Sequence, residues 1–372
     1  MHIRRKLIKV GISLVVLVGL AGGGAYTYVR YRYGQIPKIH GTAVSPIGAA
    51  SPIDILIAGT DSRQGLTAAQ QKLYGNTAVA GGNRSDATMI VRVIPSSKRI
   101  SLLSIPYDTF VPIYGTNGPN KISDALNFGP KALVKTIENS IHVPINAYIG
   151  VNFNGVMQLV QSLGGIKVDF PYPSKDTMSG LNVGAGCQVL NGTQALALAR
   201  SRFFYYYKGG HWLYDGSSGF GRIHRQHTVI RAMINKAKSS IVTNPLALNA
   251  FIGTAVKNVE INSKLSLGQL VHLAMDFRSF SGSNLTTYTY PTQIVNNYGK
   301  YGDVLFPVKS LDAGVVAKFL SQGSTTAAPT SGVGTAGATS PSSQPSSGSL
   351  PPAIMGSIVQ NRTRPSFDPV PC

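Results

Sequence analysis

The chain has 372 residues, of which 43% are hydrophobic and 8% aromatic, so it can bury at least one sizeable core and is neither disordered nor fibrous. Lysine and arginine number 34 against 14 aspartate and glutamate residues, a formal charge of +20. This excess of positive charge predicts an anionic partner. The candidates are nucleic acid, a membrane surface and a phosphorylated substrate. Two cysteines exclude a disulfide-rich miniprotein and a cysteine-rich metal cluster.

The first predicted element is a membrane-crossing helix at residues 10–29, which carry no formal charge. About 20 such residues span the hydrocarbon core of a bilayer. More basic residues precede this segment than follow it, so residues 1–9 are expected in the cytoplasm and the rest of the chain outside. The alternative is a cleaved signal peptide, because residues 21–25 are small. In either case the body is extracytoplasmic, and with the anchor retained the protein is a single-pass protein of the cell membrane.

Three further regions follow the predicted anchor. Residues 30–50 are expected to be a spacer, residues 51–320 a folded extracytoplasmic domain, and residues 321–372 a disordered tail rich in Ser, Thr, Gly and Pro. Between residues 54 and 319 the chain keeps 25 basic and 13 acidic residues, so the domain itself is basic.

Apolar strand-like runs alternate with helical patterns along the domain, which predicts an α/β fold. We expect an α/β/α sandwich with a central mixed sheet. The expected strands are residues 53–59, 88–94, 100–105, 147–153, 166–170 and 286–291. The expected helices are residues 130–141, 155–163, 192–200, 220–241 and, more weakly, 265–277.

Charged residues interrupt this apolar pattern at two strand ends. Asp61 and Arg63 follow the first strand, and Arg84 and Asp86 precede the second. Ligands bind at strand ends in open α/β sheets. Carboxylates suit Mg²⁺ and arginines suit phosphate, so the two pairs predict a metal–phosphate site, with surface or capping ion pairs as the alternative.

A second basic cluster follows later in the chain. Arg200 and Arg202 end one predicted helix, and Arg222, Arg225 and Gln226 lie near the start of the next, on one face of it. A positive charge near a helix N-terminus interacts unfavourably with the helix dipole, so a bound anion is expected to offset the charge of these arginines. The alternative is a solvated basic face.

Residues 203–214 (FFYYYKGGHWLY) hold eight aromatic or histidine residues and are expected to form a loop between the two arginine groups. Flat rings with a polar edge are suited to stacking on sugars. Packing on the domain, or insertion into the membrane interface, is the alternative.

Several ordered motifs together resemble those of the LytR-CpsA-Psr proteins of bacterial cell-wall assembly. The motifs are DILIAGTDSR, NRSDATMIV, SLLSIPYDT, KISDAL, VNFNGVMQLVQSLGGIKVDF, LNGTQALALARSR and GFGRIHRQ. The resemblance is close over about residues 53–240 and looser to about residue 319. It implies an extracytoplasmic enzyme behind one membrane helix, a phosphotransferase that moves an undecaprenyl-pyrophosphate-linked glycopolymer, such as teichoic acid or capsule polysaccharide, onto peptidoglycan.

The resemblance also implies roles for individual residues. Asp61 and Asp86 would be Mg²⁺ ligands, and Asp86 would also deprotonate the acceptor hydroxyl. Asp86, Arg200 and Arg202 are the expected catalytic residues. The expected pyrophosphate-binding set is Arg63, Arg84, Lys121, Arg200, Arg202, Arg222, Arg225 and Gln226. In the family the motif around Pro106 usually reads S-I-P-R-D, whereas Tyr107 stands at the arginine position in this chain.

A groove for the polyprenyl chain is expected between apolar faces. The candidate walls are Leu133, Ile137, Ile141, Val156, Leu159 and Val160, together with strand 147–153. Core packing of the same faces is the alternative. Whether Cys187 and Cys372 form a disulfide is left open by the sequence.

Three other functions compete with transfer. A nucleic-acid-binding protein is disfavoured, because the body lies outside the cytoplasm and no DNA- or RNA-binding motif is present. A non-catalytic polyanion-binding wall protein is the stronger alternative, although such a protein has no use for Asp61 and Asp86. Hydrolysis of a polyprenyl pyrophosphate uses the same groups as transfer.

Overall fold

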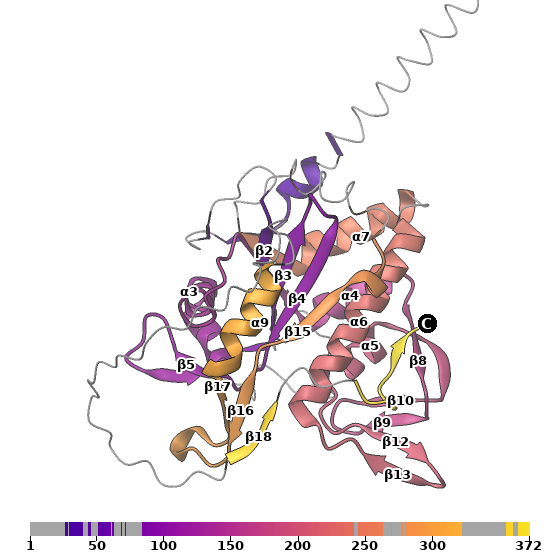
Figure 1. Cartoon of the computed structure of the whole chain (residues 1–372). Coiled ribbons are helices and arrows are strands. Elements are labelled where there is room, and N and C mark those ends of the chain that lie inside the picture. The colour runs from indigo at the N-terminus through magenta and orange to yellow at the C-terminus, as the bar shows by residue number, and fades with distance from the viewer. Residues whose placement is uncertain are drawn as a thin grey trace, which may run out of the picture.

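A computed structural model describes most of the predicted domain. It describes residues 27–28, 30–39, 44–45, 51–60, 62, 68, 71, 84–241, 245–262, 269, 277, 280–321, 355–359 and 364–372. A mixed central sheet runs through these residues, with α3 and α9 on one side of it and α4, α5, α6 and α7 on the other (Figure 1). The predicted α/β architecture is therefore present.

The central sheet has seven strands in the order β1-β14-β7-β2-β3-β4-β15. In that order they are Lys38–Ile39, Val259–Asn262, Ala147–Asn152, Ile53–Thr60, Ser85–Ile94, Arg99–Ile105 and Thr286–Thr289. β2 pairs in parallel with β7 and antiparallel with β3, so the sheet is mixed as expected.

The helices cover the two faces of this sheet. Their bounds are Ile122–Phe128 for the 3-10 helix η1, Pro130–Ile141 for α3, Phe153–Ser162 for α4, Gly192–Arg200 for α5, Ser218–Ile241 for α6, Pro245–Asn258 for α7 and Lys309–Ser321 for α9. Two further 3-10 helices are Gly282–Asn284 (η2) and Gly299–Tyr301 (η3). Alternate residues of β2 serve the two faces, because successive strand side chains point to opposite sides. Leu56 packs with Leu133 of α3 on one face, and Ile55 packs with Ala147 on the other.

Helix α6 is also tied to the sheet by a buried polar contact. The Nε2 atom of His227 lies 2.8 Å from the hydroxyl of Ser104 on β4. Burial, and secondarily the charge of Arg231, lowers the pKa of His227 to about 3, so its imidazole is neutral at physiological pH. This contact fixes the rotation of α6, the helix that carries Arg222 and Gln226.

Smaller sheets surround the central one. β10-β9-β12-β13 comprises Leu181–Val183, Ser174–Asp176, Tyr205–Lys208 and His211–Tyr214. β11-β8-β19 comprises Gly186–Leu190, Ile166–Phe170 and Val370–Pro371. β17-β16-β18 comprises Val304–Pro307, Thr292–Val295 and Met355–Val359, and β5 (Phe110–Pro112) pairs with β6 (Pro119–Lys121).

Most predicted elements are confirmed within one or two residues. The predicted helices 130–141 and 192–200 and the strand 166–170 coincide with α3, α5 and β8. The second predicted strand is longer at its start, because β3 begins at Ser85 and so includes Asp86. The weak helix prediction at 265–277 lies almost wholly outside the described residues.

The predictions for the N-terminal region have different outcomes. Most of the predicted anchor, residues 10–26 and 29, lies outside the described part of the chain. No helix within that part is both long and apolar enough to cross a membrane. The predicted spacer at 30–50 is wrong in one respect, because Lys38 and Ile39 form β1, which pairs with β14 and is an edge strand of the central sheet. Val44 is buried in the main core, so the domain begins before residue 51.

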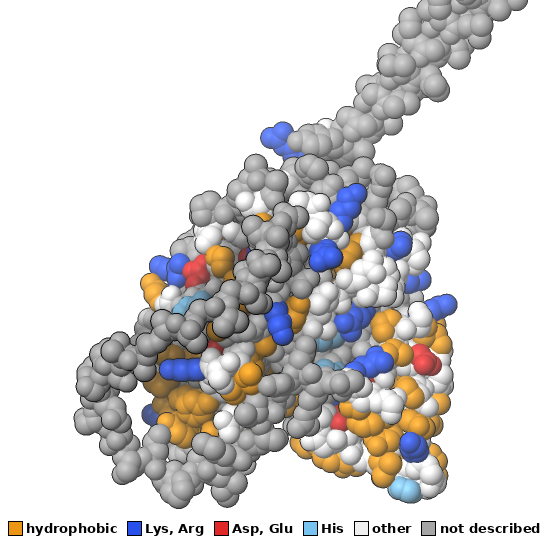
Figure 2. Space-filling model, viewed as in Figure 1, with side chains coloured by type: hydrophobic (Ala, Val, Ile, Leu, Met, Phe, Trp, Pro, Cys, Tyr) orange, Lys and Arg blue, Asp and Glu red, His pale blue; other side chains and the backbone are white. Residues whose placement is uncertain are grey.

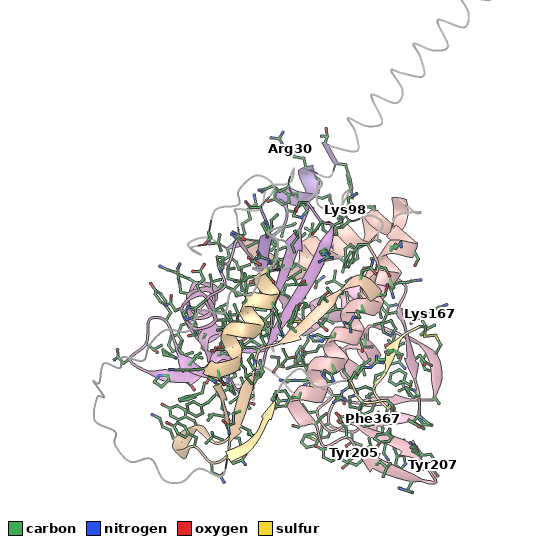
Figure 3. All side chains as sticks on the ribbon, viewed as in Figure 1. Arg30, Lys98, Lys167, Tyr205, Tyr207 and Phe367 are labelled. Carbon is green, nitrogen blue, oxygen red and sulfur yellow. A yellow bond between two sulfur atoms is a disulfide. The ribbon has the colours of Figure 1, made fainter. Side chains whose placement is uncertain are left out.

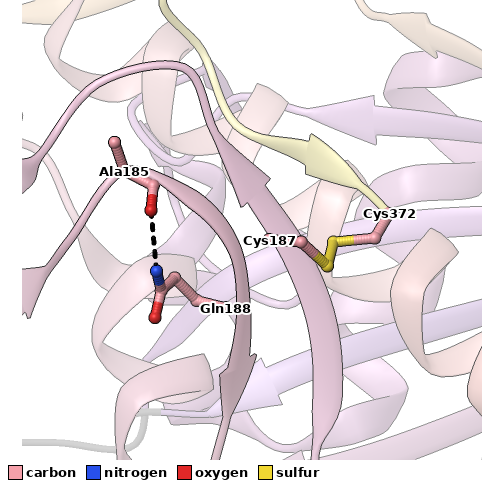
Figure 4. Close-up of a disulfide and its surroundings, with 4 residues drawn as sticks. All are labelled: Ala185, Cys187, Gln188 and Cys372. Carbon is pink, nitrogen blue, oxygen red and sulfur yellow. Dashed lines mark hydrogen bonds between the residues drawn. A yellow bond between two sulfur atoms is a disulfide. The ribbon is translucent and has the colours of Figure 1, made fainter.

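The prediction of a disordered tail over residues 321–372 is also wrong in part. β18 pairs with β16, and residues 364–372 form a segment that lies against β8 and α6; we call it the C-terminal strap. Its last residue, Cys372, forms a disulfide with Cys187 of β11 (Figure 4). The cross-link and the burial of Asp368 stabilise a segment whose composition alone predicts disorder. Residues 322–354 lie outside the described residues.

The aromatic segment 203–214 forms a β-hairpin rather than a loop. β12 and β13 pair antiparallel around Gly209 and Gly210, whose φ angles are +62° and +86°. Two consecutive positive φ angles are typical of the type I′ turn that closes two-residue hairpins, and glycine adopts them without a steric cost. The backbone of this segment is therefore fixed by strand pairing.

Candidate functional site

The candidate site lies where three strand ends meet at one edge of the central sheet. Thr60 ends β2 and pairs with Ser85 at the start of β3 and with Asn152 at the end of β7. Asn152 also caps α4 by accepting a hydrogen bond from the Gly155 amide at 2.8 Å. The chain thereby brings Asp86 to the start of α4, as expected for a ligand site at strand ends.

A polar pocket of about 330 Å³ opens at this edge. Asp86, Arg200, Arg202, Arg222 and Gln226 all line it, so the structure brings five of the predicted site residues together. The remaining lining residues are Tyr107, Phe153, Asp176, Met178, Ser179, Ala199 and Phe203. The two arginine groups, about 20 residues apart in sequence, therefore serve one pocket.

The ring of Tyr107 contacts the guanidinium groups of two of these arginines. The guanidinium carbons of Arg202 and Arg222 lie 5.2 and 5.5 Å from the centre of its ring, within the range of a cation–π contact. Arg222 is also 3.9 Å from a carboxylate oxygen of Asp86. Burial, together with the nearby charge of Arg202, lowers the pKa of Arg222 to about 10, so Arg222 remains charged at neutral pH. Arg202 and Arg222 carry like charges and contact the same ring, so an anion bound between them would reduce their mutual repulsion.

Arg200 is placed by the way α5 begins and ends. The helix starts with a capping box, in which the Asn191 and Gln194 side chains each accept a hydrogen bond from the other's backbone amide, at 3.0 and 3.1 Å. It ends at Arg200, whose guanidinium carbon lies 4.5 Å from the centre of the Phe153 ring. A cation at a helix C-terminus is favoured by the helix dipole.

The backbone between Arg200 and Arg202 is clamped by a buried carboxylate. Asp176 accepts hydrogen bonds from the Ser201 hydroxyl at 2.6 Å and the Phe203 amide at 2.9 Å. Its other oxygen accepts from the amides of Met178 and Ser179. Asp176 therefore fixes the direction in which Arg200 and Arg202 leave the chain.

An apolar cavity of about 260 Å³ adjoins the polar pocket. It lies between α4, α5, α6 and the sheet, and Val156, Leu159, Leu196, Ile230 and Met233 are among its lining side chains. The cavity and the pocket share Asp86, Phe153, Ala199, Arg200 and Gln226.

Only part of the predicted groove wall faces this cavity. Val156 and Leu159 line it, as do Val151, Asn152 and Phe153 of the strand 147–153. Val160 instead belongs to a closed core beside β8. The predicted α3 residues are wrong, because Leu133, Ile137 and Ile141 are fully buried against the opposite face of the sheet. An amphipathic pattern does not tell which face of the sheet a helix covers.

The structure does not bring Arg225 into the pocket. Its side chain is fully buried and forms ion pairs with Asp215 at 2.9 Å and with Asp368 of the C-terminal strap at 3.0 Å. It also donates to the Ser201 carbonyl at 3.2 Å. A Cβ on residue 221 would lie 2.5 Å from an Asp215 oxygen and 2.6 Å from an Arg225 nitrogen, so a side chain there would displace this ion pair. Arg225 is a positioning residue behind Arg200 and Arg202.

Two other predicted residues lie beside the pocket without lining it. Arg84 forms an ion pair with Asp124 of η1 at 3.0 Å, and its side chain is about half exposed. Lys121 forms an ion pair with Asp108 at 2.8 Å. The remaining two, Asp61 and Arg63, lie outside the described residues.

The donor set for a metal is incomplete in the described residues. Within them, no group of three His, Cys, Asp or Glu side chains is close enough to hold a metal ion. Asp86 is the described candidate ligand, with about a quarter of its side chain exposed to the pocket. Asp61 directly follows Thr60, whose sheet partner Ser85 directly precedes Asp86.

Sequence analysis missed two residues that shape the site, because Asp176 clamps the arginine segment and Asp368 neutralises Arg225. It placed Phe153 in the groove wall but missed its contact with Arg200. The scarcity of acidic residues was the available signal, because with 14 carboxylates against 34 basic residues, each buried aspartate is expected to hold a specific partner.

Comparisons with known proteins identify the fold and the family. The crystal structure of TagV from B. subtilis superposes with a TM-score of 0.57 at 26% identity, over 74% of this chain and 98% of that one. A structure of TagT bound to LIIa-WTA has the same fold, with a TM-score of 0.55 at 21% identity over 77% and 98% of the two chains. The LytR_cpsA_psr family matches residues 25–316. The chain belongs to this family.

Curated relatives carry transferase names. This chain is 31% identical, over 68% of its length and 80% of the relative, to the polyisoprenyl-teichoic acid–peptidoglycan teichoic acid transferase TagU of Halalkalibacterium halodurans. It is 28% identical to the transferase of the same name from Enterococcus faecalis, over 73% and 82% of the two chains. The resemblance found in the sequence motifs is confirmed.

Proposed function

We propose that this protein is a phosphotransferase that moves a glycopolymer from a polyprenyl-pyrophosphate carrier onto peptidoglycan. The observation that carries the proposal is the junction of the arginine pocket with the apolar cavity through five shared wall residues. A lipid-linked pyrophosphate has the same two parts, a doubly anionic head and an apolar chain. The names of the curated relatives support the same reaction.

In this proposal the pocket arginines bind the pyrophosphate. Arg200, Arg202 and Arg222 converge on a space lined by one partly exposed carboxylate, Asp86. Each arginine–phosphate pair at about 4 Å contributes on the order of 4 kcal/mol at an effective dielectric constant of 20. Gln226 lines the same pocket and can donate from its amide. Arg63, Arg84 and Lys121 stay proposed contacts for more distant parts of the anion.

Asp86 is the proposed general base. It accepts the proton of the acceptor hydroxyl as that oxygen forms its bond to the glycan-bearing phosphorus and polyprenyl phosphate leaves. Arg222, at 3.9 Å, keeps this carboxylate beside the phosphate site. Asp61 and Asp86 would hold Mg²⁺, since hard carboxylate oxygens are its usual protein ligands and the two residues adjoin a paired position of β2 and β3. Bound Mg²⁺ would withdraw charge from the phosphate oxygens.

The apolar cavity is the proposed site for the start of the polyprenyl chain. Val156 and Leu159 of α4 face Ile230 and Met233 of α6 across it. Each buried CH₂ group contributes about 0.8 kcal/mol, so even a short length of chain adds substantially to carrier affinity. A membrane anchor at residues 10–29, with the domain outside the cytoplasm, would hold the protein at the surface where the carrier resides.

The test is transfer by the full-length protein in detergent micelles. A donor labelled in its glycan is supplied with peptidoglycan, and both labelled insoluble product and released polyprenyl phosphate are measured. Asp86→Asn should lower the rate at least about a hundredfold, as expected for the loss of a general base, and weaken Mg²⁺ binding in calorimetry. Asp169→Asn, which changes a carboxylate on β8 outside the pocket, is the matched control.

Each other outcome selects a different function. Polyprenyl phosphate released without labelled peptidoglycan would identify a pyrophosphatase. Labelled donor that is bound but released by salt, with no covalent product, would identify a polyanion-binding protein. Unchanged Mg²⁺ affinity in the Asp86→Asn variant would remove this residue from the metal site.

A further inference from the structure

The hairpin of β12 and β13 has two faces with different environments. Tyr206 points inward, where its ring stacks on Phe367 of the C-terminal strap at 4.3 Å and 8°. Phe204, just before the hairpin, is fully buried in the adjoining core. Packing therefore accounts for the inner face of this aromatic segment and leaves its outer face unexplained.

The outer face carries two cross-strand pairs of aromatic rings. Tyr205 lies opposite Tyr214 with ring centres 5.2 Å apart, and Tyr207 lies opposite Trp212 with centres 5.4 Å apart. Tyr207, Trp212 and Tyr214 are each about 40% exposed. Figure 2 shows hydrophobic side chains gathered over this end of the molecule. Exposed aromatic rings on a strand-paired backbone form a rigid surface that is available to a ligand.

This surface is continuous with the arginine pocket. Phe203 lines the pocket, and its ring lies 6.4 Å from that of Tyr214 at an angle of 19°. The two cross-strand pairs lie about 7 Å apart along the strands, because each strand residue adds about 3.4 Å. We call these rings the aromatic row; its members are Phe203, Tyr205, Tyr207, Trp212 and Tyr214.

The charge around the aromatic row is positive. The ammonium group of Lys175, on the neighbouring strand β9, lies 4.0 Å from the centre of the Trp212 ring. Lys208 lies on the other face of the hairpin, with its ammonium group 5.3 Å from the centre of the Tyr172 ring, and Asp215, which follows Tyr214, is buried in its ion pair with Arg225. Asp176 follows Lys175 but is buried, with its oxygens accepting four hydrogen bonds. The surface therefore combines aromatic rings with a cation and suits a sugar chain that carries negative charge.

The hairpin also lies far from the N-terminal residues. Arg30 is at one end of the molecule, whereas Tyr205 and Tyr207 are at the opposite end (Figure 3). With the proposed anchor at residues 10–29, the aromatic row points away from the membrane. This placement removes insertion into the membrane interface as an explanation for the exposed rings.

We propose that the aromatic row binds the sugar residues of the donor glycopolymer that lie next to its pyrophosphate. This inference rests on the proposed function, since the donor is the substrate whose glycan continues covalently from the phosphate held in the pocket. The sugar faces stack on the rings, the spacing of the pairs matches successive sugars of an extended chain, and Lys175 contacts an anionic substituent.

The single tryptophan of the chain makes the proposal directly measurable, because Trp212 lies in the aromatic row. The probe is a synthetic tetrasaccharide of N-acetylhexosamines with a phosphate at its reducing end, titrated into the full-length protein in micelles. It should change the emission of Trp212 in a saturable way. Tri(glycerol phosphate), which has charge but no sugar ring, should leave the emission unchanged.

Variants then separate the aromatic row from the pocket. Tyr207→Ala and Tyr214→Ala should each weaken tetrasaccharide binding at least fivefold, measured by calorimetry, and leave affinity for inorganic pyrophosphate unchanged. Tyr114→Ala removes a tyrosine that is also about 40% exposed, at a site outside both the pocket and the row, and should change neither. Thermal unfolding of each variant checks that it is folded.

The outcomes distinguish this inference from the proposed function. If pyrophosphate binds but the tetrasaccharide does not affect Trp212, the aromatic row is not a sugar site, although the pocket stands. If unphosphorylated glycan strands of peptidoglycan bind the row and the phosphorylated tetrasaccharide does not, the surface serves the acceptor and the inference is overturned. Failure of pyrophosphate to bind would instead refute the pocket, whatever the tetrasaccharide does.

Discussion

Arg222 and Arg225 lie within one turn of each other on α6, each in a cluster of charged residues, and the two clusters differ in how the arginine charge is neutralised. In the pocket, Arg222 and Arg202 share the ring of Tyr107, and Arg222 has a carboxylate oxygen of Asp86 at 3.9 Å. Behind the pocket, Arg225 has two carboxylates within 3.0 Å and is fully buried. The first cluster has an excess of positive charge facing an opening, and the second has none.

This difference separates a binding role from a structural role. A buried charge is stable only when it is paired and hydrogen-bonded, so Arg225 requires Asp215 and Asp368 whether or not a ligand is present. Arg222 is also largely buried, with 8% of its side chain exposed, but the carboxylate oxygen of Asp86 is 3.9 Å away, so an anion in the pocket can still neutralise its charge. The same residue type on one helix can therefore contribute either to stability or to affinity, and substitutions should affect one without the other.

The largest effect is expected in the buried cluster. Arg225→Ala leaves two buried carboxylates without their cation, which typically costs about 3–5 kcal/mol in the free energy of unfolding. Equilibrium unfolding in urea, followed by Trp212 fluorescence, measures the change. Arg99→Ala, at an exposed strand start, is the control and should stay within about 0.5 kcal/mol of wild type. A stable Arg225→Ala variant that has lost only pyrophosphate binding would contradict the structural role.

The disulfide extends the same cluster to the chain terminus. Cys372→Ser releases the end of the C-terminal strap, which delivers Asp368 to Arg225, and should lower the free energy of unfolding by about 2–4 kcal/mol. Thermal melting with and without a reductant tests this, since the reductant should destabilise the wild type but not the variant. Equal melting temperatures for both proteins in either condition would mean that the strap stays in place without its cross-link.

Substitution of an arginine in the pocket should lower activity rather than stability. Arg202→Ala should lower transfer at least about tenfold, equivalent to about 1.4 kcal/mol of transition-state binding, with the free energy of unfolding nearly unchanged. Initial rates and urea unfolding on the same preparation give both numbers. Wild-type rates in this variant would remove Arg202 from the proposed catalytic set.

The smallest effect is expected at Tyr107. A cation–π contact contributes about 0.5–1 kcal/mol at a partly exposed site, so Tyr107→Ala should weaken pyrophosphate binding several-fold by releasing Arg202 and Arg222. Tyr107→Phe keeps the ring and should bind nearly as well as wild type. Calorimetry with inorganic pyrophosphate compares the two variants, and equal losses in both would assign the effect to the hydroxyl group instead.

The sequence by itself determined the main elements and the composition of the pocket. Apolar periodicity located α3, α5 and β8, because burial of one face dictates the spacing of apolar residues. Ordered motifs located Asp86, Arg200, Arg202, Arg222 and Gln226, which the fold brings into one pocket. The sequence also contains a signal for the hairpin, since Gly209-Gly210 between two aromatic runs is typical of a tight turn.

Only the tertiary structure decided which charges were neutralised and which apolar faces were in contact. Arg225 and Arg222 have the same local sequence signal, and they differ because Arg225 alone pairs with Asp215, just before α6, and with Asp368, 143 residues further along the chain. Likewise α3 and α4 have similar amphipathic patterns, yet α4 lines the cavity and α3 packs on the opposite face of the sheet. A local pattern records that a residue is buried or charged, whereas its partner is set by contacts between segments far apart in sequence.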